Sequence, residues 1–140
     1  MVELGGNTTH PLPAFLQNRD VRTAYAFALL RASLAVQVKG LRESRGKTIE
    51  VCAAQVGVSA RYWASIEDQT ALPSLPLLEK IAALFDVALI VRFASWGEWA
   101  RAYLGEGVQE SIRIPRSWGE EEAELLALTG KKGDEELPMP

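Results

Sequence analysis

Apolar residues recur at helical spacing over most of residues 19–85, and each run follows a residue that can cap a helix. Asn, Ser and Thr side chains cap helices because they accept hydrogen bonds from the free amides of the first turn. The capping residues are Asn18, Thr48, Ser59 and Ser74. The predicted helices span residues 19–44, 49–56, 60–68 and 75–85. The pattern therefore predicts a mainly α-helical fold.

The long first helix carries apolar residues at steps of three, four and five positions, and we expect this stripe to face the core. The members of the stripe are Val21, Tyr25, Ala28, Ala32, Val36 and Leu41. Gly40 lowers the helix propensity near the end of this helix. Its missing side chain permits another part of the chain to pack closely there.

The spacing changes after residue 87, where residues 88–93 form a short β-branched run that predicts a strand. Its apolar side consists of Leu89, Val91 and Phe93. Residues 112–114 are a candidate second short strand. Symmetric pairing of the first strand with a second copy of the chain, or with residues 111–114, would satisfy its backbone groups. We therefore expect residues 88–104 to form a dimerisation element.

The tetrapeptide Ser-Trp-Gly-Glu occurs at residues 95–98 and again at 117–120. Each copy has the form of a capping box, in which the serine bonds the amide three residues on and the glutamate reaches back to the serine amide. The helices that they open are expected to end near Leu104 and Thr129. Repeated capping chemistry explains this recurrence more simply than an internal duplication does.

These elements divide the chain into four parts. Residues 1–17 are expected to be a flexible arm, 18–87 the main helical domain, 88–104 the strand with its short helix, and 105–140 an acidic extension with a disordered end. The longest apolar runs are too short to cross a bilayer. The first residues also lack the basic and apolar regions of a signal peptide.

The net charge of −3 conceals an uneven distribution. Residues 19–63 hold eight basic and three acidic groups, whereas residues 64–140 hold seven basic and fourteen acidic groups. This asymmetry is typical of a basic binding face with an acidic appendage, although charged helix surfaces that merely contact solvent would give the same count.

Candidate catalytic and metal-binding chemistry is sparse. The only cysteine, Cys52, excludes an intramolecular disulfide and favours a reducing cytoplasm. The only histidine, His10, lies in the polar N-terminal stretch. We therefore expect no enzyme activity, no metal site and no cofactor.

The most informative window is residues 48–67, which has the pattern of two helices joined by a tight turn. Such a pair needs a small residue at the closest approach, glycine in the turn and apolar residues at fixed offsets afterwards. The residues that meet these demands are Cys52, Ala53, Val56, Gly57, Val58, Trp63 and Ile66. Trp63 and Cys52 are interpreted as core residues rather than as a stacking platform and a redox switch.

Several motifs in order resemble the Cro/repressor-type helix-turn-helix family, the XRE or lambda-repressor-like group. They are LRESRGKT at residues 41–48, Ala53, GVS at 57–59, IE at 66–67, PSL at 73–75 and LEKIA at 78–82. The resemblance covers about residues 34–87, and the continuation to the first Ser-Trp-Gly-Glu resembles a subgroup found in prophages and mobile elements. It implies a lambda-repressor-like DNA-binding domain within residues 18–87.

The resemblance also implies which residues meet DNA, because the second helix of the pair enters the major groove with its N-terminus first. The implied base contacts are Ser59, Ala60, Arg61 and Ser65. The implied phosphate contacts are Arg42, Arg45, Lys47, Thr48 and Tyr62. Of the base-facing set, only Arg61 has the forked geometry that reads guanine. Ile49 stands where many members of the family have a phosphate-binding glutamine.

The expected function is that of a cytoplasmic, dimeric transcriptional repressor that binds a palindromic site on double-stranded DNA. One alternative is the antitoxin of a toxin–antitoxin pair, which would bind a toxin protein through another segment. A second alternative is a protein-interaction module that kept this scaffold and lost specific DNA recognition, as Ile49, Ala60 and Ser65 would suggest.

Overall fold

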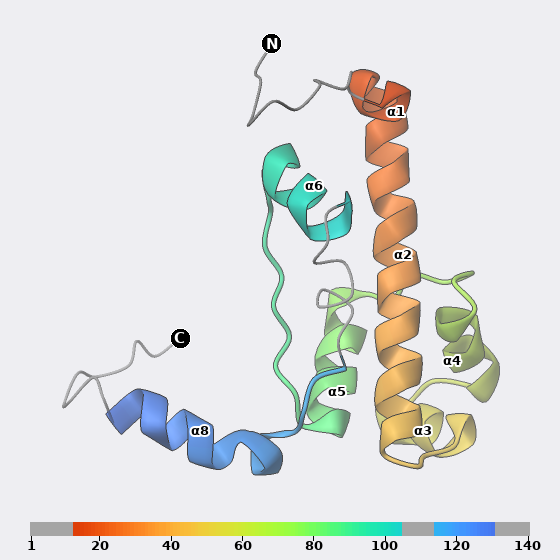
Figure 1. Ribbon diagram of the computed structural model, residues 1–140. Helices are drawn as coiled ribbons and strands as arrows, with labels where there is room; N and C mark the ends of the chain where they lie inside the picture. The colour runs from red at the N-terminus through yellow and green to blue at the C-terminus, as the bar shows by residue number, and fades with distance from the viewer. Residues whose placement is uncertain (1–12, 105–113, 131–140) are drawn as a thin grey trace.

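The computed structural model of the protein describes residues 13–104 and 114–130, and every regular element in these ranges is a helix (Figure 1). The helices are α1 (Ala14–Gln17), α2 (Arg19–Ser44), α3 (Ile49–Val56), α4 (Ala60–Glu67), α5 (Leu75–Phe85), α6 (Trp96–Leu104) and α8 (Trp118–Gly130). The prediction of a mainly helical chain is confirmed. The bounds of the first four predicted helices agree with α2 to α5 within one residue.

The predicted caps explain why these bounds could be read from the sequence. The side chains of Asn18, Thr48, Ser59 and Ser74 each accept a hydrogen bond from the amide three residues on. The end of α3 is set by Gly57, whose φ of +80° lies in the left-handed region that favours glycine. Local chemistry therefore determines where each of these helices begins and where α3 ends.

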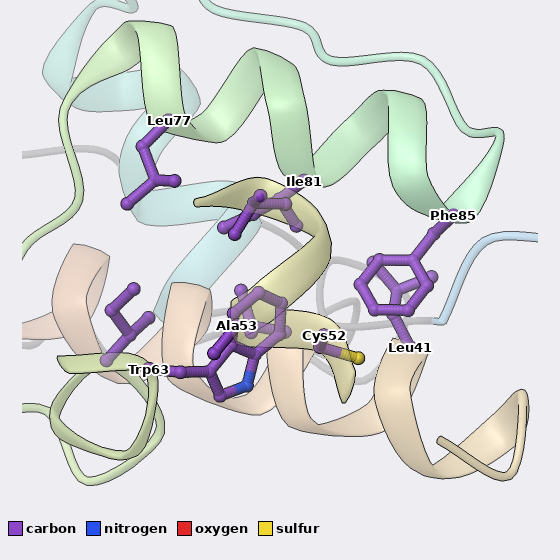
Figure 2. Packing of buried hydrophobic residues seen from close by; sticks show 10 residues of the cluster. Leu41, Cys52, Ala53, Trp63, Leu77, Ile81 and Phe85 are labelled. Carbon is purple, nitrogen blue, oxygen red and sulfur yellow. The ribbon is translucent and has the colours of Figure 1, made fainter. Parts of the chain in front are cut away.

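The core lies among α2, α3, α4 and α5, with the indole of Trp63 at its centre (Figure 2). Trp63 and Cys52 are 0% exposed, and the ring of Phe85 meets the indole edge to face with 6.3 Å between centroids. The interpretation of Trp63 and Cys52 as packing residues is thus confirmed. Burial raises the pKa of the Cys52 thiol, which keeps it protonated at neutral pH.

The predicted apolar stripe of α2 is wrong for most of its length. Val21 and Val36 are 47% and 46% exposed, whereas Ala35, Val38 and Leu41 are buried. The step from Val36 to Leu41 rotates a helix by about 140°, so these two residues cannot share a face. Only the C-terminal half of α2 contacts the core. Its buried apolar residues, Ala35, Val38 and Leu41, are spaced three apart.

The predicted strand at residues 88–93 is also wrong, because residues 87–95 run between α5 and α6 as a drawn-out segment without regular structure (Figure 1). The side chains of Ile90 and Phe93 are 83% and 103% exposed. A strand needs a neighbouring strand to bond its backbone, and the described residues provide none. Of the second predicted strand, residues 112 and 113 lie outside the described residues, and Ile114 belongs to no strand.

Two further expectations concern the ends of the chain. Residues 14–17 were expected in a flexible arm, but they form the short helix α1, whose Phe15 stacks on Tyr25 at a centroid distance of 4.4 Å. This stacking of Phe15 on Tyr25 holds α1 against α2. Residues 1–12 and 131–140 lie outside the described residues.

Helix α6 lies beside the N-terminal half of α2 (Figure 1). The two helices contact each other through aromatic rings. The ring of Trp99 is 6.1 Å from that of Tyr25, and it also meets Trp96 and Tyr103 within α6. The predicted capping box opens this helix, since Ser95 Oγ accepts a hydrogen bond from the amide of Glu98. The contact forms a small aromatic cluster outside the main core.

Residues 114–118 attach the C-terminal part of the chain to α2 and α5. The side chain of Ile114 occupies the space that a Cβ atom on Gly40 would need. The amide of Trp118 donates to the carbonyl of Asp86, and the guanidinium of Arg45 donates to the carbonyls of Phe85 and Pro115. Gly40 therefore permits the close packing that its position suggested.

We expect Gly40→Ala to detach this segment while the main core stays folded. The new methyl group must displace Ile114, whereas alanine raises the helix propensity of α2 by about 1 kcal/mol. Hydrogen exchange measured by NMR should show the Trp118 amide exchanging about tenfold faster, because its bond to Asp86 opens more often. Gly119→Ala is the matched control, since no atom lies within 4 Å of a Cβ there. Unchanged protection of Trp118 in Gly40→Ala would show that Ile114 does not hold the segment.

Candidate nucleic-acid interface

Helices α3 and α4 form a compact pair joined by a short turn. The amide of Val58 donates to the carbonyl of Ala53 at 2.9 Å, which closes the turn behind the left-handed Gly57. Of the seven residues assigned to the core of this motif, the structure buries Cys52, Ala53, Val56, Trp63 and Ile66. Val58 is half-buried and Gly57 is exposed in the turn. The N-terminus of α4 is consequently held at a fixed angle to α3.

The carboxylate of Glu67, at the end of α4, connects three elements of the fold. It accepts hydrogen bonds from Arg42 Nε at 2.7 Å and Arg42 Nη2 at 2.9 Å, which form a forked ion pair with α2. It also accepts a hydrogen bond from the indole nitrogen of Trp63. The remaining guanidinium nitrogen of Arg42 donates to the carbonyl of Lys47, in the turn before α3. This network therefore ties α4 to α2 and to the start of α3.

The environment of Glu67 favours its charged form. Burial raises the pKa of this carboxyl. The hydrogen bonds from Arg42 and Trp63 and the charge of Arg42 lower it by more, so the pKa lies below its ordinary value. The hydrogen bond to Glu67 likewise raises the pKa of Arg42. The pair is 15% and 8% exposed at its side chains, so water screens it weakly. Glu67 is therefore a structural ion-pair partner that holds α4 to α2.

The residues assigned to base contacts lie at the start of α4 and along it. They differ in whether their polar groups are free to bond a ligand. Ser59 Oγ accepts from the amide of Tyr62, and Ser65 Oγ donates to the carbonyl of Tyr62, so both hydroxyls have partners within α4. Ala60 is half-buried. Arg61 is exposed, and among the described residues its guanidinium has no hydrogen bond or ion pair. Arg61 is thus the group on α4 that is free to meet a ligand.

The five residues assigned to phosphate contacts do not form one free surface. Arg42 is committed to Glu67, and Arg45 donates to Ser44, Phe85 and Pro115, on the side of α2 where the C-terminal segment attaches. Both guanidinium groups therefore serve the fold, which the spacing of basic residues alone did not reveal. Each guanidinium already makes three hydrogen bonds within the fold, so their assignment to phosphate contacts stays a prediction.

The other three phosphate candidates lie at the α3–α4 pair. Thr48 caps α3 by accepting from the amide of Val51, and the half-buried Tyr62 packs against the core. Lys47 Nζ lies 3.4 Å from Gln55 Oε1, which is a long, exposed hydrogen bond. Gln55 was not singled out from the sequence, although its place two turns after Thr48 puts it on the same face of α3. Gln55 and Arg61 are exposed and Lys47 is half-buried, and each of the three carries a long polar side chain at or beside this pair.

Residues 33–92 match a family model described as a helix-turn-helix domain. The matched range contains the whole α3–α4 pair, the core helix α5 and the C-terminal half of α2. No curated protein and no solved structure matches the chain. The match is consistent with a helix-turn-helix family, while the Cro/repressor subgroup and the link to prophages remain predictions. None of the described helices has both the length and the hydropathy that crossing a bilayer demands.

We expect Glu67→Gln to destabilise the protein by about 2–4 kcal/mol at pH 7, because it leaves the Arg42 charge buried without a counter-ion. A carboxyl whose folded pKa is lowered contributes stability that is complete above its unfolded pKa and is lost as the pH falls through the folded pKa. The difference between wild type and variant should therefore shrink at acid pH. Urea unfolding at a series of pH values measures it, with the exposed Glu79→Gln as control. A difference that is the same at pH 7 and at low pH would exclude an ionised Glu67.

Proposed function

We propose that the chain is a sequence-specific DNA-binding regulator that acts in the cytoplasm as a dimeric repressor. The observation that carries the proposal is the state of Arg61, which is exposed on the first turn of α4 and free of partners among the described residues. The helix itself is fixed by the Glu67 network. A preorganised helix with a free guanidinium near its N-terminus is what major-groove recognition requires.

In this proposal, some residues recognise bases and others position the protein on the phosphate backbone. Arg61 would donate in a fork to the O6 and N7 atoms of one guanine in each half-site. Ala60, beside it, could rest against a thymine methyl group. Lys47 would bind a phosphate at the start of α3, and Ser59, Ser65, Thr48 and Tyr62 would add short-range contacts to the same duplex. Repression would follow from occupation of a promoter and would need no cofactor and no catalytic group.

A second candidate is the antitoxin role, which α8 favours. This helix contains no buried residue, and it presents Trp118, Leu126 and Leu128 at 57%, 65% and 63% exposure beside glutamates. Phosphates would repel such an acidic segment, whereas a basic protein partner would attract it. A toxin-like reading frame next to the gene would favour this candidate over a simple repressor.

We expect Arg61→Ala and Lys47→Ala to weaken DNA binding in different ways. Loss of a forked base contact should cost about 1–3 kcal/mol on the preferred site and relax the preference at one base pair per half-site. Loss of a phosphate contact should weaken binding to all duplexes alike and lower the salt slope by about one phosphate. Fluorescence anisotropy with preferred and random duplexes at several salt concentrations measures both effects.

The matched control is Lys80→Ala, which removes an exposed charge from α5 instead of from the α3–α4 pair. It should leave the ratio of preferred to random affinity unchanged. If Arg61→Ala kept the wild-type ratio, Arg61 would not read a base. If the wild type itself showed no preference among duplexes, the protein-interaction module would be the better description.

A further inference from the structure

In residues 13–104 and 114–130, which the structure describes, nothing covers one face of α2 where it continues beyond the core. Val38 and Leu41 are buried on this face, and the same helical spacing leads back to Leu34, Leu30 and Phe27. Phe27 is 58% and Leu30 40% exposed, so the apolar face emerges from the core and reaches solvent. The aromatic contacts of α1 and α6 are made by Tyr25, which lies on the other side of α2. An apolar helix face of this kind is typical of a helix that packs against another helix.

Two opposite charges accompany Phe27 on this uncovered face. Asp20 precedes it by seven residues and Arg31 follows it by four, so helical geometry places both on the same side of α2. Both are exposed, and neither has an ion pair among the described residues. Ala24 lies between Asp20 and Phe27 and leaves room for a large side chain. The face therefore carries a positive end, a negative end, a large ring and a small residue.

We propose that α2 of a second copy of this chain packs antiparallel on the face formed by Asp20, Ala24, Phe27, Leu30 and Arg31. A two-fold axis between Tyr25 and Ala26 brings Arg31 of each copy beside Asp20 of the other. The same register brings each Phe27 against the other copy's Ala24. Opposite charges meet and a large residue faces a small one, which is how antiparallel helices select register. A parallel arrangement would instead bring Arg31 beside Arg31.

This pairing surface is preferred to the exposed residues Leu89, Val91 and Phe93, which we predicted as the dimerisation element. Those residues lie in the segment without regular structure, which would have to become a strand on association. In contrast, α2 is already helical, so its association orders no additional backbone.

This dimer adds a structural basis to the proposed repressor function, and its relevance to DNA binding rests on that proposed function. In the proposed register, Val38 and its copy stand about 37 Å apart along the helix axis, because an α-helix rises about 1.5 Å per residue. Val38 lies where α2 meets the α3–α4 pair in the core. This separation is close to one turn of B-DNA, about 34–36 Å, which separates the half-sites of dimeric helix-turn-helix proteins.

Sedimentation velocity of the full chain without DNA, from about 1 to 100 μM, tests the pairing independently of DNA binding. The wild type should show a concentration-dependent monomer–dimer equilibrium. Phe27→Glu should raise the dimer dissociation constant about tenfold or more, because it places two carboxylates in the apolar centre of the pair. Phe93→Glu, which makes the same change at another exposed phenylalanine, should leave the equilibrium unchanged.

Charge reversal tests the register. Asp20→Arg alone and Arg31→Asp alone should each weaken the dimer, because each creates two like-charge contacts across the axis. The double variant D20R/R31D should restore it, since both ion pairs return with their signs exchanged. Far-UV circular dichroism checks that each variant is folded.

Three results would overturn the proposal. A wild type that is monomeric at every concentration excludes the pairing. Loss of the dimer in Phe93→Glu but not in Phe27→Glu assigns the interface to residues 88–93. Failure of the double reversal to restore a dimer that each single reversal weakens excludes the antiparallel register. None of these outcomes depends on whether the chain binds DNA.

Discussion

The ion pair between Arg42 and Glu67 is the contact on which the arrangement of the helix-turn-helix pair depends. Helix α4 is eight residues long, and a helix of this length has little stability of its own in water. Glu67 bonds it to α2 through Arg42 and to the core through Trp63, while Arg42 also bonds the turn before α3. Together with the turn closed behind Gly57, this carboxylate and the indole beside it hold α4 in place.

The position of Arg61 follows from that constraint. Trp63 and Ile66 are buried on the inner side of α4, so the opposite side of its first turn must face outward. Arg61 lies on that side and has no partner among the described residues. A long, flexible side chain thus extends from a helix whose backbone is fixed. This combination distinguishes Arg61 from Arg42 and Arg45, whose donors are bonded to the fold itself.

The sequence predicted what is local and missed what depends on distant partners. Caps such as Thr48 and Ser59 act within one helical turn, so the bounds of α3 and α4 could be read directly. The strand at residues 88–93 was predicted from composition, but a strand exists only through a partner that sequence spacing cannot supply. The predicted apolar stripe on α2 was wrong for a related reason. Contacts with α3, α4 and α5 decide which face of α2 is buried. The family resemblance implied that Arg42 and Arg45 contact phosphates, whereas the structure shows that both guanidinium groups form hydrogen bonds within the fold.

In the proposed function, α4 reads the bases of a specific duplex. Selection of the duplexes that the wild type binds from a random pool, followed by sequencing, tests it most directly. We expect enrichment of a two-fold symmetric site whose halves are about one helical turn apart and share a guanine at the position that faces Arg61. A bound pool with the same base composition and no common motif would contradict the claim.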